Sequence, residues 1–430
     1  MRKFLVVLLA LGFVVAFSMP AAASDVTFGG TYWVKGYLES NPNKLADTED
    51  DGESQQDWYA QRMRVVGTWA VADGLTLNTR FDVMEKIWGS ADAYHSANAG
   101  SNISWERAYI TYKSPIGKFD VGYMAGGGFG TVFNDDVGSV PRIKYTGSFG
   151  PVIILALTEK GNEEDGINSP AGLDNADGDY DKYAVAALYK FPGGIAGALW
   201  FYLPDKRDRA FDGTTYNLVR NYLPVYFKWT LGDLYLEGEA SYFWGTYEYE
   251  DNRTDKDITG ASWYLYGKYK LGPAYVGGQY GYVEYGKNTA TDWETGYYDN
   301  SDWDPCLILF NYWLNIFQNT GADGATSQIT SSLGLNNGSL YQVFGGFSPM
   351  ENLTIHASLS YAVADEKPAG YVDDEYGTEF DLTATWKIVD QLEYMIGFGY
   401  LFTGDFYKKD DATTQVEDDY LLMHQLTLSF

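Results

Sequence analysis

The chain has 430 residues, with 58 Asp and Glu against 30 Lys and Arg and a formal net charge of −28. This acidic excess excludes a chain built to bind nucleic acid, because like charges repel the phosphates. Aromatic residues make up 17% of the chain, including 37 Tyr and 13 Trp, and so much apolar surface excludes a disordered polymer.

The N-terminus has the pattern of an export signal. Two basic residues precede an apolar run over residues 4–17, and small residues follow it. Residues 1–24 are therefore expected to form a secretory signal peptide that is cleaved near Ala23. The run is shorter than the ~20 apolar residues of a spanning helix. Residues 25–430 are then expected to form a single exported domain.

Apolar and polar side chains alternate along most of residues 25–430. In 391–402 the residues on even positions are Leu, Tyr, Ile and Phe, and in 376–388 the aromatic and aliphatic residues again share one parity. Alternation with period two indicates strands with one apolar and one polar face. A soluble sandwich shows alternation too, but many segments of about nine residues or more favour tilted membrane strands. The predicted fold is an all-β, antiparallel, up-and-down transmembrane barrel.

Short turns alternate with long loops, and their number predicts the strand count. The short turns are Asp73–Gly74, Ser114–Gly117, Phe149–Pro151, Pro192–Gly194, Leu231–Asp233, Leu271–Pro273, Ser348–Asn352 and Val389–Gln391. Because both ends of such a barrel lie on one side, these turns predict 18 strands, with 16 as the second choice. The long loops, expected to face outward from the cell, are 39–56, 87–102, 125–139, 160–179, 204–216, 249–258, 286–338, 364–374 and 403–415. Loop 286–338 is long enough to contain a further hairpin.

Basic residues fall on the polar parity of the early strands. In 61–71 Met, Val and Trp occupy the apolar parity, which turns Arg62 and Arg64 toward the interior. The predicted basic wall of the pore consists of Lys35, Arg62, Arg64, Arg80, Arg107, Arg142 and Lys144. Inside a barrel these charges meet water, whereas a basic residue facing the bilayer midplane would cost ~2–4 kcal/mol. Alternatively, they form ion pairs with Asp82, Glu106 and Asp120 on neighbouring strands.

Acidic residues take the inward parity later in the chain. The predicted acidic pore lining consists of Glu237, Glu239, Glu379, Asp381 and Glu393. These residues and the acidic loops favour cations, whereas the basic wall favours anions. The sequence therefore leaves the ion preference open, with a lean toward cations.

One acidic loop is a weak candidate for binding Ca²⁺ or Mg²⁺. Its carboxylates belong to Asp174, Asp177, Asp179 and Asp181, and such oxygen ligands suit hard cations. The loop lacks the bidentate Glu of an EF-hand. A solvated acidic loop is the expected state, and no resident metal or cofactor is predicted.

An apolar segment interrupts the longest loop. Asp304 and Pro305 precede the mostly apolar residues 306–317, and Asp as N-cap with Pro in the first turn predicts a short helix. The helix is expected inside the lumen or across its mouth, and an additional strand pair or a subunit contact are the alternatives. Because Cys306 is the single cysteine, an intramolecular disulfide and a cysteine-cluster metal site are excluded, and Cys306 is expected to be a buried apolar residue.

The C-terminal segment has the most specific pattern. Its apolar parity holds Tyr420, Leu422, Leu426, Leu428 and Phe430, interrupted by His424. Together with the signal, strands, short turns and acidic loops, this pattern resembles the Gram-negative outer-membrane porin superfamily over all of 25–430. In that superfamily a terminal Phe after alternating apolar residues is the signal for the barrel-assembly machinery, a role that the resemblance gives to Leu426, Leu428 and Phe430. Eighteen strands resemble substrate-selective porins rather than the 16-stranded general porins.

The resemblance also implies a constriction loop. The third long loop of a porin commonly folds into the barrel, and here Gly126, Gly127 and Gly128 permit a tight path. Asp135 and Asp136 would then face the basic wall and create a transverse field across the pore. The resemblance further implies the outer membrane, contact with lipopolysaccharide, and a homotrimer packed through small residues such as Ala184, Ala186, Ala187 and those of 193–198.

The predicted function is a water-filled channel for passive diffusion of small hydrophilic solutes and ions. The alternatives are a substrate-selective porin, or a barrel scaffold or adhesin that works through its acidic surface loops. No enzyme activity is predicted. His356 lies two residues from Ser358 on one face of a strand, which is ordinary spacing for residues that line a lumen.

Overall fold

The computed structural model describes residues 25–46, 55–89, 103–134, 138–163, 178–207, 210–211, 214–249, 252–289, 291–295, 303–311, 314, 335 and 337–430. The predicted signal peptide lies outside these residues. In the part of the chain that is described, no helix is long and apolar enough to cross a membrane.

Long antiparallel strands form the wall of the molecule. They are β1 (Val26–Glu39), β2 (Gln56–Ala72), β3 (Leu75–Ile87), β4 (Ile103–Ser114), β5 (Gly117–Ala125), β6 (Ser139–Phe149), β7 (Val152–Asn162), β8 (Tyr180–Phe191), β9 (Gly194–Asp205), β11 (Thr214–Leu231), β12 (Leu234–Tyr249), β13 (Lys256–Leu271), β14 (Ala274–Val283), β17 (Gly338–Met350), β18 (Leu353–Val363), β19 (Glu375–Val389), β20 (Leu392–Thr403) and β21 (Asp419–Ser429).

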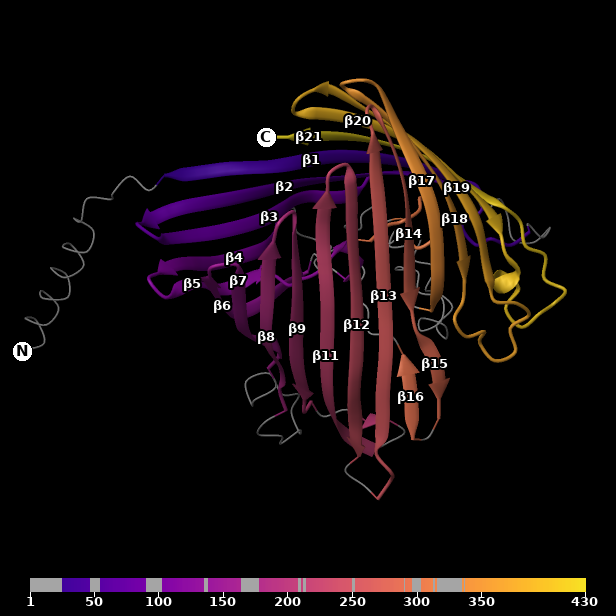
Figure 1. Cartoon of the computed structure of the whole chain (residues 1–430). Helices are drawn as coiled ribbons and strands as arrows, with labels where there is room; N and C mark the ends of the chain where they lie inside the picture. Colours follow the sequence, from indigo (N-terminus) through magenta and orange to yellow (C-terminus); the bar gives the residue numbers. More distant parts are fainter. Residues whose placement is uncertain are drawn as a thin grey trace, which may run out of the picture.

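Each wall strand pairs with the wall strand before and after it, and β1 also pairs with β21, so the sheet closes on itself (Figure 1). The predicted antiparallel barrel of 18 strands is confirmed. Each of the predicted short turns joins two wall strands. The count succeeds because Gly and Pro mark one end of nearly every hairpin.

Within the described part of the chain, three short strands lie outside the ring. They are β10 (Ala210–Phe211), β15 (Tyr285–Asn288) and β16 (Asp292–Thr295). β15 and β16 form a further hairpin, which loop 286–338 was long enough to contain, and β16 pairs with the loop end of β13 through Asp257 to Thr259. This hairpin lengthens the rim and does not change the number of wall strands (Figure 1).

The outer face of the barrel is apolar and exposed. Trp105 is 64% exposed, Val343 62% and Phe430 55%. An apolar surface that surrounds a barrel suits contact with lipid hydrocarbon rather than water. Leu426 and Leu428 lie on the same face, as predicted for the last strand. His424 also faces outward, where its ring nitrogen lies 3.3 Å from the hydroxyl of Tyr59.

The largest buried cluster lies inside the barrel, where two loops fold inward. The first inward loop, residues 126–134, contributes Phe133, and the second inward loop, residues 303–311, contributes Trp303, Ile308 and Leu309. These side chains pack against lumen-facing wall residues such as Tyr264. The expectation that a loop folds into the lumen is confirmed.

The helix predicted from Asp304 and Pro305 is wrong at its start. Residues 303–311 form turns and bends, and the amides of Ile308 and Leu309 donate to the carboxylate of Glu379 instead of joining a helix. Leu314 is helical, and its amide donates to the side-chain oxygen of Asn311 at 2.8 Å. Asn311 therefore supplies the N-cap that Asp304 was expected to supply. Residues 303–311 and Leu314 lie inside the lumen, which is one of the two positions expected for this segment.

Candidate channel interior

The predicted basic wall lies on the inner face of β1 to β6, and its guanidinium groups are paired. Arg64 donates to both carboxylate oxygens of Asp82, at 2.8 and 2.7 Å, and Arg62 donates to Glu85 at 3.2 Å. Asp82 is a register neighbour of Arg64, so strand pairing places the two side chains together. A bidentate pair fixes the guanidinium against the wall.

The remaining members of the basic wall also have partners. Arg80 lies 3.6 Å from Glu106, Arg142 lies 2.5 Å from Glu159, and Lys144 lies 3.5 Å from Asp120. Arg107 donates to the hydroxyl of Ser139, and Lys35 lies over the ring of Trp33. The alternative drawn from the sequence, ion pairing with Asp82, Glu106 and Asp120, therefore holds for Arg64, Arg80 and Lys144.

Glu159 is an inner-face residue that the sequence reasoning missed. It accepts hydrogen bonds from Arg142 and forms an ion pair with Lys182 at 2.7 Å. β7 has Leu155 and Leu157 on its inner face, so an apolar-outward rule assigns the wrong parity there. The register across the turn between β6 and β7, which pairs Arg142 with Glu159, is the signal that identifies it.

The first inward loop crosses the lumen from β5 to the opposite wall. The amide and the hydroxyl of Thr131 both donate to one carboxylate oxygen of Glu239 on β12, at 2.6 and 2.9 Å. Phe133 stacks on Tyr264 with ring centroids 5.1 Å apart. The loop has Gly128 at φ +99° and Gly130 at φ +100°, conformations that favour glycine. Of the predicted constriction residues, Asp135 and Asp136 lie outside the described residues.

The acidic lining therefore holds loops and hydroxyls in place. Glu239 binds the first inward loop, while Glu237 accepts the hydroxyls of Tyr235 and Tyr264 at 2.7 and 3.2 Å. Glu393 lies opposite Lys387 in the register of β19 and β20. The sequence predicted inward carboxylates but not their loop partners, because those contacts join residues 70 to 108 positions apart.

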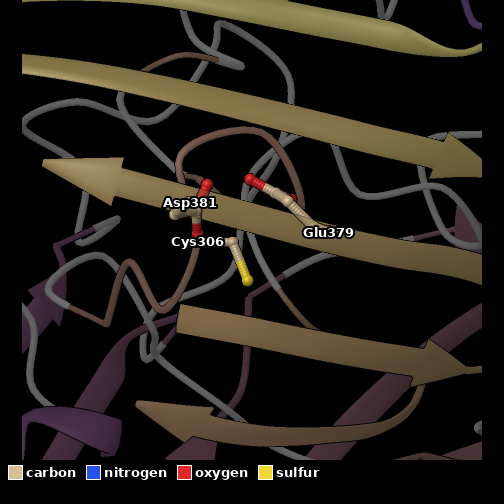
Figure 2. A group of neighbouring side chains, drawn as sticks. All are labelled: Cys306, Glu379 and Asp381. Atoms are coloured by element: carbon tan, nitrogen blue, oxygen red, sulfur yellow. The ribbon is translucent and has the colours of Figure 1, made fainter. Parts of the chain in front are cut away.

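The second inward loop is held by β19. The two carboxylate oxygens of Glu379 accept the amides of Ile308 and Leu309, each at 2.7 Å. Asp381 accepts the hydroxyl of Ser358 at 3.1 Å. Cys306 lies beside both carboxyl groups and is 4% exposed, as expected for a buried residue (Figure 2). Burial raises the pKa of the Cys306 thiol well above its usual range.

Among the described residues, two cavities lie inside the barrel next to the inward loops. One, of about 600 Å³, is lined by residues that include Lys228, Glu237, Lys268, Gln279 and Asp304. The other, of about 290 Å³, lies between Gly126–Phe129 and the wall, and it is lined by Leu155, Leu157, Leu199 and Arg142 among others. The first cavity combines charged and amide groups with aromatic rings such as Tyr264 and Trp303, and the second combines leucine side chains with basic groups.

Asp179 and Asp181 both pair with Lys160, which neutralises part of the weak cation candidate, while Asp174 and Asp177 lie outside the described residues.

Ala184 and Ala186 pack inside the barrel against Leu199, so the prediction that they form an outer subunit contact is wrong. The residues of β8 that face the lumen are apolar, so the rule that apolar residues face the membrane placed them on the wrong side.

The histidine considered for catalysis has a different partner. His356 Nδ1 lies 2.8 Å from the hydroxyl of Tyr275 on β14. The hydroxyl of Ser358 donates to Asp381, not to His356. The arrangement at these two residues is one of fixed hydrogen bonds in the wall.

Comparisons with known proteins identify the fold. No family model and no curated protein matches the chain. Among solved structures, Pseudomonas aeruginosa OccK9 (OpdG) is 13% identical with a TM-score of 0.52, and the match covers 94% of this chain and 99% of that one. Pseudomonas aeruginosa OccK2 (OpdF), solved in complex with glucuronate, is 11% identical with a TM-score of 0.51 and coverage of 96% and 99%.

A third similar structure is the anion-selective porin from Comamonas acidovorans, at 12% identity and a TM-score of 0.46, and the match covers 95% of this chain and 100% of that one. At these identities the likeness concerns the fold and not the solute. The chain has the fold of the outer-membrane porins.

Proposed function

We propose that the chain is an outer-membrane channel through which small hydrophilic solutes and ions diffuse passively. The main support for a channel is the cavity of about 600 Å³ inside the closed barrel, whose lining includes Lys228, Glu237, Lys268 and Asp304. Charged side chains inside a barrel of this size are stable only where water reaches them. The exposed apolar outer face supports the membrane location.

The two inward loops are the proposed selectivity elements. Each is anchored to the wall by backbone amides that donate to a buried carboxylate, Glu239 for the first loop and Glu379 for the second. A narrowing fixed in this way has a defined size and charge, which is what discrimination among solutes requires. A substrate-selective channel is thus the more specific alternative to a general diffusion channel.

The cavity of about 290 Å³ favours this alternative. Its leucines and Phe129 would contact an apolar part of a solute, while Arg142, Lys144 and Lys182 outnumber Glu159 at the same surface. Such a lining favours an anion with an apolar body over a small cation.

Bilayer conductance tests the proposal. The full chain, refolded in detergent, is expected to give stable single-channel steps in salt and to admit neutral sugars into liposomes at rates that fall with sugar size. A membrane-inserted barrel without conductance steps would instead support the scaffold or adhesin function. Reversal potentials in a salt gradient then give the ion preference.

The oligomer and the assembly route belong to the same proposal. A homotrimer, contact with lipopolysaccharide, and reading of Leu426, Leu428 and Phe430 by the assembly machinery are expected of an outer-membrane porin. Leu426 and Leu428 on β21 and Phe430 directly after it are exposed on one side, which is the arrangement that such a reader needs. Cross-linking in detergent, with and without Phe430→Ser, measures the oligomer and the assembled fraction.

A further inference from the structure

Cys306, Glu379 and Asp381 form a closed cluster behind the second inward loop. The sulfur and one oxygen from each carboxylate all lie within 4.8 Å of one another (Figure 2). Figure 2 shows the two carboxyl groups projecting toward one another from β19, with Cys306 beside them. Glu379 is fully buried, and Asp381 and Cys306 are 3% and 4% exposed.

The cluster lacks positive charge. Within the described residues, no lysine or arginine forms an ion pair with Glu379 or Asp381, whereas the inner-face carboxylates Asp82, Asp120 and Glu159 each have at least one basic partner. Two neighbouring carboxylates out of water repel each other and lose their hydration. They need either a shared proton or a bound cation.

The hydrogen bonds leave one ligand atom unused. Both oxygens of Glu379 accept backbone amides, and Asp381 accepts Ser358. Oδ1 of Asp381 is buried without a hydrogen-bond partner. It lies on the side of Glu379, because a Cβ added at Gly399 would stand 3.0 Å from Asp381 Oδ1 and 3.4 Å from Glu379 Oε1.

We infer that Cys306, Glu379 and Asp381 bind one divalent cation of the zinc class, which fastens the second inward loop to β19. Thiolate and carboxylate are both ligands of Zn²⁺, and hard cations would not use the sulfur. The thiol proton goes to solvent when the metal–sulfur bond forms. The amides of Ile308 and Leu309 stabilise the negative charge that remains on the ligands.

The geometry requires a small contraction. With usual bond lengths, the sulfur and oxygen ligands of tetrahedral zinc lie about 3.6 Å apart. The three atoms, within 4.8 Å of each other, therefore move together by about 1 Å on binding. The hydroxyl of Ser360, 3.2 Å from the sulfur, or a water completes the coordination. Because the ligands are buried, the metal enters while the loop docks during folding.

Refolding with Co²⁺ tests the site directly. The full chain refolded with Co²⁺ is expected to retain about one metal per chain after gel filtration and to show the near-ultraviolet thiolate-to-cobalt charge-transfer band. Cys306→Ser and Asp381→Asn each are expected to lose at least tenfold in retained metal. Glu239→Gln, which alters the other loop anchor and no thiol, is the matched control and retains the band.

A second measurement does not depend on the variants folding. In the wild-type chain, metal bound during refolding is expected to slow maleimide labelling of Cys306, and removal of the metal with a chelator in mild denaturant restores it. Absence of the charge-transfer band together with unchanged labelling would overturn the site. An infrared band of a protonated carboxyl that disappears in Asp381→Asn would assign a shared proton instead. Neither readout involves conductance, so the test is separate from that of the channel.

Discussion

Glu239 on β12 accepts both the backbone amide and the hydroxyl of Thr131, from the loop between β5 and β6, at 2.6 and 2.9 Å. One carboxylate oxygen thus fixes a loop that begins on the far side of the lumen. Loop and wall are joined by a charge-assisted contact, which is stronger than a neutral hydrogen bond. The first inward loop therefore holds one position in the lumen and narrows it permanently.

Glu239→Gln is expected to loosen the first inward loop. Hydrogen bonds to a charged group contribute about 1.5–3 kcal/mol, and every 1.4 kcal/mol is a tenfold change in the population of the displaced loop. Single-channel recordings should show larger conductance with frequent transitions. Glu237→Gln, on the same face of β12, is the control and should leave the recordings steady; equal noise from both variants would contradict the anchoring role.

Substitutions at two glycines of the same loop distinguish the effect of backbone strain from the effect of a steric clash with Glu239. Gly130→Ala is expected to release the loop, because the added Cβ would lie 2.5 Å from a carboxylate oxygen of Glu239. Gly128→Ala has nearly the same φ but nothing within 4 Å of the new atom. Both variants bear a backbone cost of about 1–3 kcal/mol. Only Gly130→Ala should therefore increase conductance noise in bilayers.

Arg64→Ala is expected to shift the channel toward cations. Loss of the guanidinium leaves the buried carboxylate of Asp82 without its bidentate partner, at a cost of about 1–3 kcal/mol in stability. Reversal potentials in a salt gradient measure the shift. The double variant Arg64→Gln with Asp82→Asn keeps the net charge of the wall and should restore the reversal potential of the wild type. The paired variant Arg62→Ala with Arg64→Ala should give a larger shift than Arg64→Ala alone.

The seam between β1 and β21 is expected to weaken at high pH. Lys44 lies 3.3 Å from Glu39 and 3.1 Å from Asp419. Burial opposes its charge, but these carboxylates outweigh burial and raise the pKa of Lys44 above its ordinary value. Because the folded pKa exceeds the unfolded one, the stabilisation is complete below pH ~10.4 and falls as the pH rises through the folded pKa.

Heat-dependent gel mobility against pH measures this effect. The unfolding temperature of the wild type should fall above pH ~10.4, and Lys44→Met should remove that part of the dependence. An identical pH profile for Lys44→Met would show that other groups control alkaline unfolding. Lys409→Met, in another loop, serves as the control.

The wall of the barrel was predictable because its rules are local. Alternation with period two identifies the strands, and residues such as Gly74 and Gly193, which adopt positive φ, mark the turns. Parity failed on β7 and β8, where Leu155 and Ala184 face inward beside the apolar cavity. There the lumen itself is apolar, so hydropathy no longer distinguishes the two faces.

The interior contacts were not predictable in the same way. The sequence identifies Glu239 and Glu379 as inward carboxylates, but their partners Thr131 and Leu309 lie in loops whose paths depend on the closed barrel. Asn311 and Asp304 are equally good helix caps by type, and only the position of Glu379 decides between them. Tertiary contact here overrides local preference.

The pairing of the first and last wall strands makes closure an all-or-none event. Gly30 and Phe430 exchange backbone hydrogen bonds at 2.8 and 3.0 Å, across 400 positions of the chain. Until β21 is in place, β1 and β20 each present an unpaired edge, which is a template for aggregation. Contacts between distant residues also form slowly. Protection of the unpaired strand edges from aggregation is therefore most important just before the final strand docks. A chain truncated before Asp419 could not close its barrel and would keep both edges exposed.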